Sequence, residues 1–148
     1  KTVLELGSGT GVTGIALAMN VDCRVIFTDY EEFSCQLCHH NCEINNLDNF
    51  ETLVADWRDF PEIEENIDVV ICSDVLYEKK QVAPLFNVLN TFLQKKIPVY
   101  LADPGRAYIN DFLSLVKDAG YSIKASKEKD MKENKLLSAT NVYVIENS

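Results

Sequence analysis

The stretch Val3-Leu4-Glu5-Leu6-Gly7-Ser8-Gly9-Thr10-Gly11 decides the fold that we expect for this chain. With Thr2, its apolar residues predict a short buried strand over 2–6, and glycines at alternate positions follow at once. Glycine lets the backbone bend sharply and approach a ligand closely, because it carries no Cβ. Residues 12–20 then have helical composition. The stretch therefore predicts a strand, a glycine loop and a helix N-terminus in direct succession.

Strand-like and helix-like segments alternate along the rest of the chain. We expect strands at 24–29, 52–56, 67–74 and 97–103, and helices at 32–46, 80–94 and 108–118. The segments 121–126 and 140–146 predict a closing hairpin, with the charged stretch Lys127–Lys135 as a solvated loop or extension. This order predicts an α/β fold, a Rossmann-like doubly wound sheet that is mostly parallel with a C-terminal antiparallel hairpin. We expect one domain over residues 1–148.

Composition and charge narrow the classes of partner. The net charge of −9 disfavours nucleic-acid binding. It would attract a basic peptide or a protein that presents lysine, but on charge alone we prefer the interpretation that the acidic surface keeps the protein soluble. No run of about 18 apolar residues occurs, so we expect no membrane span. Because the chain opens directly on its first strand, we expect that an N-terminal segment is missing. The expected location is cytoplasmic, or mitochondrial if a eukaryotic targeting segment has been lost. The sequence predicts no oligomeric state.

The ends of the expected strands carry the candidate site. In a doubly wound sheet the ligand binds at the carboxyl ends of the strands. Glycine or aspartate stands at or beside five such ends: Gly7–Gly11, Asp29, Asp56, Asp74 and Asp103. Asp29 can accept both hydroxyls of a ribose, Asp56 can accept from an adenine amino group, and Trp57 can pack on the ring. Each of these residues is also compatible with a cap, a turn or plain packing.

The glycines alone leave two cofactor classes open. Gly9-x-Gly11-x-x-Gly14 also satisfies the dinucleotide pattern of nicotinamide-dependent oxidoreductases. Glu5 favours the other class, S-adenosylmethionine, because a carboxylate suits a cationic amino-acid moiety and repels a pyrophosphate.

Several segments together resemble a known family. "VLELGSGTGVTGIAL" (3–17), "TDY" (28–30), "ADW" (55–57) and "SDVLY" (73–77) resemble the seven-β-strand S-adenosylmethionine-dependent protein methyltransferases. More narrowly, they resemble the lysine methyltransferases with an Asp/Glu-x-x-Tyr/Phe motif after the fourth strand, here Asp74-Val75-Leu76-Tyr77. "NCEIN" (41–45) and "ADPGRAY" (102–108) are similar to the branch of the electron-transfer flavoprotein β-subunit lysine methyltransferases and their bacterial relatives.

The resemblance implies S-adenosylmethionine as cofactor and a role for individual residues. It places these residues around the cofactor: Glu5, Gly7, Ser8, Gly9, Gly11, Asp29, Tyr30, Asp56, Trp57 and Ser73. It implies that Asp74 and Tyr77 face the acceptor, a lysine of a protein substrate. Asp74 would bind and orient the amine, and Tyr77 would form one wall. Residues 103–106 predict a β-turn, with Arg106 as a further substrate contact.

"CQLCHHNC" (35–42) looks like a haem or zinc motif, and we predict neither. Cys35, Cys38 and Cys42 are spaced so that they share one side of a helix. Their axial span of about 10.5 Å is too long for one zinc with bonds of about 2.3 Å. With Phe33, Leu37 and Ile44 predicted as a second apolar face, the cysteines are expected to fill core space.

Other functions remain open at this point. A small-molecule N-methyltransferase shares the fold and the cofactor site, and a non-catalytic scaffold could retain the glycine loop. An oxidoreductase gives no role to Glu5 or to Asp74-x-x-Tyr77. A nucleic-acid amino-methyltransferase more usually has Asp/Asn-Pro-Pro-aromatic after the fourth strand, and this chain has no proline there.

Overall fold

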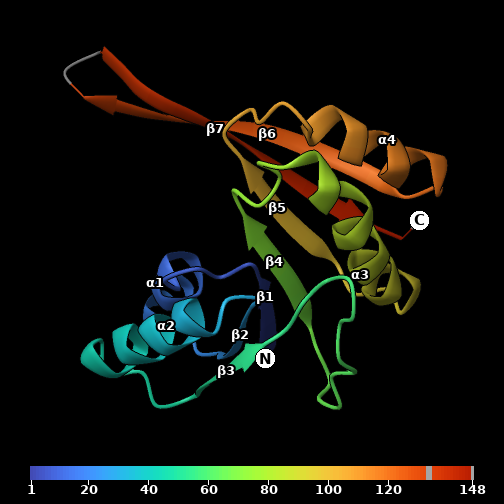
Figure 1. Cartoon of the computed structure of the whole chain (residues 1–148). Helices are drawn as coiled ribbons and strands as arrows, with labels where there is room; N and C mark the ends of the chain where they lie inside the picture. Colours follow the sequence, from blue (N-terminus) through green and yellow to red (C-terminus); the bar gives the residue numbers. More distant parts are fainter. Residues whose placement is uncertain (133–134, 148) are drawn as a thin grey trace. The chain divides into compact units, whose positions relative to one another are not determined.

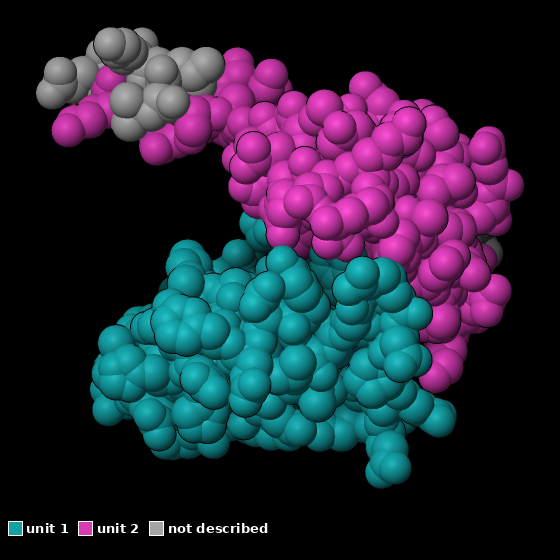
Figure 2. Space-filling model, in the orientation of Figure 1, with its two compact units in different colours: residues 1–73 teal, residues 74–148 magenta. Residues whose placement is uncertain are grey.

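The computed structural model describes residues 1–132 and 135–147, with the backbone alone for residues 135–137. The chain divides into two compact units, unit 1 over Lys1–Ser73 and unit 2 over Asp74–Ser148 (Figure 2). Each unit is described below by itself. Across the described residues, no helix reaches the length and apolar character of a membrane span.

Unit 1 contains parallel strands and the helices that join them (Figure 1). Its elements in chain order are β1 (Thr2–Leu6), α1 (Val12–Asn20), β2 (Arg24–Asp29), α2 (Glu32–Ile44), β3 (Phe50–Val54) and β4 (Val69–Ser73). β1 lies between β2 and β4, and β2 pairs on its other side with β3. Leu6 pairs with Thr28, and Asp29 pairs with Val54. This register brings the carboxyl ends of β1, β2 and β3 to one edge.

The core of unit 1 explains why α2 carries three cysteines. Cys38 and Cys42 are fully buried against Val25 and Phe27 of β2. A Cβ on Gly11 would lie 2.5 Å from the Sγ of Cys38, so the helix packs too closely for a larger side chain. The prediction that the cysteines fill the core is therefore confirmed.

The predicted second apolar face of α2 is wrong. Phe33 is 73% exposed and Ile44 is 62% exposed, so these side chains do not pack into unit 1, and Leu37 is only partly buried. The helix buries one side only, the side that carries Cys35, Cys38 and Cys42. Close packing selected the small thiols over the larger apolar side chains.

Unit 2 contains helices and an antiparallel group of strands. Its elements are the 3-10 helix η1 (Lys79–Gln81), α3 (Val82–Gln94), β5 (Val99–Asp103), α4 (Ile109–Asp118), β6 (Ser122–Lys132) and β7 (Lys135–Glu146). β7 pairs antiparallel with both β5 and β6. Its fully buried side chains include Leu85, Leu89, Leu101, Phe112 and Ile145. The buried residues of α3, among them Val82, Leu85 and Leu89, recur at helical spacing and form one buried face.

The hairpin of β6 and β7 is longer than predicted (Figure 1). The sequence predicted a solvated loop or a frayed extension over Lys127–Lys135, but Lys127–Lys132 belongs to β6 and Lys135 begins β7. Residues 133–134 lie outside the described residues. Backbone pairing with β7 holds this charged part of β6 although residues 127–132 are all exposed. Paired strands need no buried face for their hydrogen bonds, so the composition concealed them.

In the described part of the chain the strands of unit 1 lie in the order β3-β2-β1-β4, and those of unit 2 lie in the order β5-β7-β6. The pairs β1–β2, β1–β4 and β2–β3 are parallel, and β7 is antiparallel to its neighbours. The predicted α/β fold, mostly parallel with a C-terminal antiparallel hairpin, is confirmed.

Candidate functional site

The glycine loop after β1 has a backbone that only glycine adopts without strain. Gly7, Gly9 and Gly11 have φ angles of 66°, 53° and 82°, in the left-handed region. No atom lies within 4 Å of the position that a Cβ of Gly9 would occupy, so this side of the loop is open. Ser8, between them, is buried. The loop therefore presents backbone at Gly9 to an open space, as a ligand cradle requires.

Glu5 is a buried carboxyl group beneath this loop. It is only 2% exposed, and its Oε2 accepts a hydrogen bond of 3.0 Å from the backbone N–H of Gly14. Burial raises the pKa of Glu5 to about 8, and the hydrogen bond from Gly14 opposes that rise. A negative charge on Glu5 would also add to the burial that raises the thiol pKa values of Cys38, Cys42 and Cys72.

Gly14, the third glycine of the dinucleotide pattern, has a packing role. A Cβ there would lie 2.3 Å from Glu5 Oε2 and 2.4 Å from a ring carbon of Phe27. Gly14 thus lets α1 approach β1 and β2, and its N–H is one of those that a helix start leaves without an intrahelical partner. The sequence pattern contained this glycine but did not reveal that its partner is Glu5.

Asp29 ties the end of β2 to the glycine loop. Its Oδ2 accepts from the N–H of Gly9 at 2.9 Å, and its Oδ1 accepts from the N–H of Glu31 at 3.0 Å. The side chain is 8% exposed. Each carboxylate oxygen has a second lone pair, so Asp29 can accept further hydrogen bonds while it holds the loop. The structure thus brings together two predicted site residues, Asp29 and Gly9.

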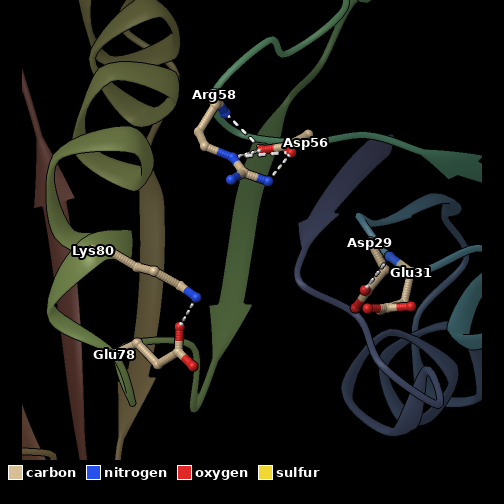
Figure 3. A network of polar contacts seen from close by, with 6 residues as sticks. All are labelled: Asp29, Glu31, Asp56, Arg58, Glu78 and Lys80. Atoms are coloured by element: carbon tan, nitrogen blue, oxygen red, sulfur yellow. Dashed lines mark hydrogen bonds and ion pairs between the residues drawn. The ribbon is translucent and has the colours of Figure 1, made fainter.

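Asp56 and Trp57 follow β3, and Asp56 is occupied by a neighbour that the sequence reading missed. The guanidinium of Arg58 forms an ion pair with the Asp56 carboxylate, and the backbone N–H of Arg58 donates to Oδ1 at 2.9 Å (Figure 3). These hydrogen bonds lower the pKa of Asp56 to about 2. Trp57 is partly buried and Tyr30 is 50% exposed. In the sequence, only the spacing Asp56-x-Arg58 could have indicated this ion pair.

The cysteines of unit 1 are chemically quiet. The thiol of Cys35 donates to the carbonyl oxygens of Leu53 and Asp29, at 3.5 and 3.7 Å. Burial raises the pKa of all three α2 thiols, which disfavours the thiolate needed for metal binding or reactivity. Among the described residues, no group of three or more His, Cys, Asp or Glu side chains is arranged to hold a metal ion.

In unit 2 the Asp74 carboxylate is held by Arg106. Arg106 Nε donates to Oδ1 at 2.6 Å and Nη2 donates to Oδ2 at 2.7 Å, which is a bidentate pair. Both side chains are 44% exposed. Asp74 has a φ of 55°, and its N–H donates to the carbonyl of Ala102 at 2.9 Å. Aspartate tolerates this left-handed backbone better than most residues.

The segment after β5 bends at Pro104 without the hydrogen-bonded turn predicted over 103–106, and the Asp103 side chain fastens the bend. Asp103 is fully buried, and its Oδ1 accepts from the N–H groups of Gly105 and Arg106 at 2.7 and 2.8 Å. Gly105 has a φ of 101°, which favours glycine. Tyr77, the other acceptor-facing candidate, is 52% exposed, and Ser73 at the end of β4 is partly buried.

Comparison with known proteins identifies relatives of the chain. A family described as "Lysine methyltransferase" matches residues 1–119. The human electron transfer flavoprotein beta subunit lysine methyltransferase is 31% identical over 107 residues, which is 72% of this chain and 40% of the relative. A histidine protein methyltransferase 1 homolog of Dictyostelium discoideum is 32% identical, over 69% of this chain and 34% of the relative. The chain thus spans well under half the length of these relatives.

A solved structure supports the fold. The magnesium protoporphyrin IX methyltransferase of Synechocystis PCC 6803, solved with bound SAM, matches with a TM-score of 0.69. The match covers 98% of this chain and 69% of that chain at 18% identity. At this identity the likeness concerns the fold alone.

Proposed function

Since the chain belongs to the lysine methyltransferase family, we propose that it transfers a methyl group from S-adenosylmethionine to a lysine of a protein substrate. The observation that carries the proposal is the match over residues 1–119, which contain the glycine loop and Asp74-x-x-Tyr77. The electron-transfer flavoprotein β-subunit is a candidate substrate, because a relative at 31% identity is named for it.

The residues of unit 1 fit the cofactor. The open side of Gly9 leaves room for close approach of a ligand to the backbone, and Asp29 beside it retains acceptor capacity for ribose hydroxyls. S-adenosylmethionine supplies a methyl group activated by a positively charged sulfur. Glu5, buried beneath the loop, would favour a cationic ligand, because a nearby positive charge stabilises its ionised form. Gly7, Ser8, Gly11, Tyr30, Asp56, Trp57 and Ser73 remain proposed contacts.

Asp74 and Tyr77 in unit 2 suit an amine acceptor. The acceptor nitrogen must present a lone pair, and removing the proton from lysine at pH 7 costs roughly 4–5 kcal/mol. Asp74 is exposed enough to accept a hydrogen bond from the amine, and the half-exposed ring of Tyr77 can line its path. Fixing the position of the amine then lowers the barrier through alignment.

Histidine is the second candidate acceptor, because one relative at 32% identity is named as a histidine protein methyltransferase homolog. A neutral imidazole already carries a lone pair near pH 7. Asp74 could orient such a ring by accepting its N–H.

The test is methyl transfer to proteins. The chain, within its longest natural form, is incubated with radiolabelled S-adenosylmethionine and a heat-treated cell lysate, and the products are separated on a gel. A discrete labelled band that is lost with Asp74→Ala is expected. Hydrolysis of the band then separates methyl-lysine from methyl-histidine.

Label in small molecules, without a labelled protein band, would indicate that the acceptor is a metabolite and not a protein. Cofactor binding without any transfer would indicate a non-catalytic domain.

A further inference from the structure

The ion pair of Asp74 and Arg106 is fixed at both ends by the backbone. The N–H of Asp74 is bound to Ala102, and the N–H of Arg106 is bound to Oδ1 of the buried Asp103. Two parallel hydrogen bonds of 2.6 and 2.7 Å then join the two side chains. Such a fork fixes the plane of the carboxylate as well as its distance.

Stability alone gives little reason for this arrangement. Exposed ion pairs contribute little to folding, because water screens the charges and two long side chains must be ordered. Asp74 also keeps a left-handed backbone, with a φ of 55°, at the position of the proposed acceptor contact. An unusual backbone at such a place points to a functional constraint.

A lone carboxylate would hinder the proposed reaction. A negative charge beside lysine favours the ammonium form, and the ammonium form has no lone pair to accept a methyl group. The site therefore needs the hydrogen-bond acceptor of Asp74 without its full negative charge.

We propose that Arg106 is a positioning residue that cancels the charge of Asp74, so that the pair accepts a hydrogen bond from a neutral amine and does not hold an ammonium ion. This inference rests on the proposed function of Asp74 as the acceptor contact. Two lone pairs of the carboxylate bind Arg106, and the others remain for the acceptor. The guanidinium stays charged at every relevant pH, and its carboxylate partner raises its pKa further.

The other charged groups near the pair leave Arg106 as the group that offsets the charge of Asp74. The carboxylate of Asp103 also raises the pKa of the Arg106 guanidinium, though less than Asp74 does. Tyr143 on β7 feels the charge of Asp103, which adds to the burial that raises the pKa of this tyrosine. Glu78 and Lys80, which follow Tyr77, form their own ion pair at 2.8 Å (Figure 3). Without Arg106, the negative charge of Asp74 would therefore have no arginine to offset it, and the buried carboxyl group of Asp103 would supply no compensating positive charge.

The pH profile of methyl transfer tests the proposal in the full-length protein. With Arg106→Gln, we expect the pH of half-maximal rate to rise by about one unit, since a charge at such distances shifts a pKa by about 1–3 units. The rate at pH 7 then falls about tenfold and recovers at high pH. Arg106→Lys keeps the charge and should keep the wild-type midpoint. Arg24→Gln is the matched control, because it removes an ion-paired arginine at the first residue of β2, the end of that strand away from Asp29.

A binding measurement separates this inference from the proposed function. Nα-acetyl-lysine methylamide is titrated into each variant at pH 7 and followed by NMR, with the norleucine analogue as the uncharged control. Arg106→Gln should bind the lysine probe about tenfold more tightly than the wild type, with no change for norleucine. Equal affinities, or an unshifted pH midpoint, would overturn the role of Arg106. A wild type without any methyl transfer would refute the proposed function, while the probe would still decide how the pair treats an ammonium ion.

Discussion

Unit 1 and unit 2 each contain a carboxyl group of the candidate site, and the two groups are held in opposite ways. Glu5 in unit 1 is 2% exposed and hydrogen-bonded to a backbone N–H. Asp74 in unit 2 is 44% exposed and paired with an arginine. Burial raises the pKa of Glu5 and so suppresses its charge, whereas the charge of Asp74 is offset by a neighbour. Changes at Glu5 should therefore affect folding, and changes at Asp74 should affect function.

The largest expected effect concerns the pH dependence of stability through Glu5. Its folded pKa of about 8 exceeds the ordinary value of 4.5, so between these pH values the folded state binds a proton that the unfolded state has released. The free energy of unfolding should then fall with rising pH, by up to about 1.4 kcal/mol per unit from this group. Glu5→Gln should lack this contribution. Denaturant titrations from pH 5 to pH 8 measure the difference, and parallel curves for the two proteins would contradict the assignment.

The next largest effect is the loss of stability when a glycine of each unit is replaced. Gly14→Val would place a branched side chain within 2.4 Å of a buried ring carbon of Phe27 and closer still to Glu5. We expect a loss of about 3 kcal/mol in the free energy of unfolding, at the upper end for overpacking. Gly120→Ala in unit 2 meets no atom within 4 Å but keeps a φ of 85°. It should cost only about 1 kcal/mol, from backbone strain. Chemical denaturation measures both free energies of unfolding. Equal losses would show that the side chains beside Gly14 move to make room.

The smallest effect concerns the ion pair of unit 1, which parallels that of unit 2. Arg58→Gln removes the hydrogen bonds that hold the pKa of Asp56 near 2. We expect this pKa to rise towards 3.8, with an unchanged melting temperature, because both groups are exposed to water. NMR titration of the Asp56 carboxyl group measures the pKa. A pKa that stays near 2 would show that another group governs Asp56.

The two units also differ in how far the sequence predicted them. In unit 1 the strand at Thr2–Leu6 and the helix at Val12–Asn20 have the predicted bounds, because a buried apolar run and a glycine loop are local signals. In unit 2 the extended hairpin was missed over Lys127–Lys132, because pairing with β7 is non-local and leaves no apolar alternation.

Contacts within the site were less predictable than its residue types. Two separate motifs contained Asp74 and Arg106, but the ion pair between these residues depends on backbone positions 32 residues apart in the chain. The spacing of α2 allowed either face to be buried, and only the close approach of Gly11 to Cys38 selects the cysteines. The close packing of Gly14 on the Glu5 carboxyl group likewise could not be predicted from the glycine pattern.

The central claim is that unit 1 binds the cofactor and that Asp74 of unit 2 serves the acceptor. Its most direct test measures S-adenosylmethionine affinity by calorimetry and methyl transfer on the same samples of wild type and Asp74→Asn. Asparagine tolerates the left-handed backbone and keeps the side-chain shape. We expect unchanged cofactor affinity and a loss of transfer of at least about tenfold, because an amide has one acceptor oxygen instead of two and Arg106 occupies it. Full transfer by Asp74→Asn, or loss of cofactor binding together with transfer, would contradict this division of roles.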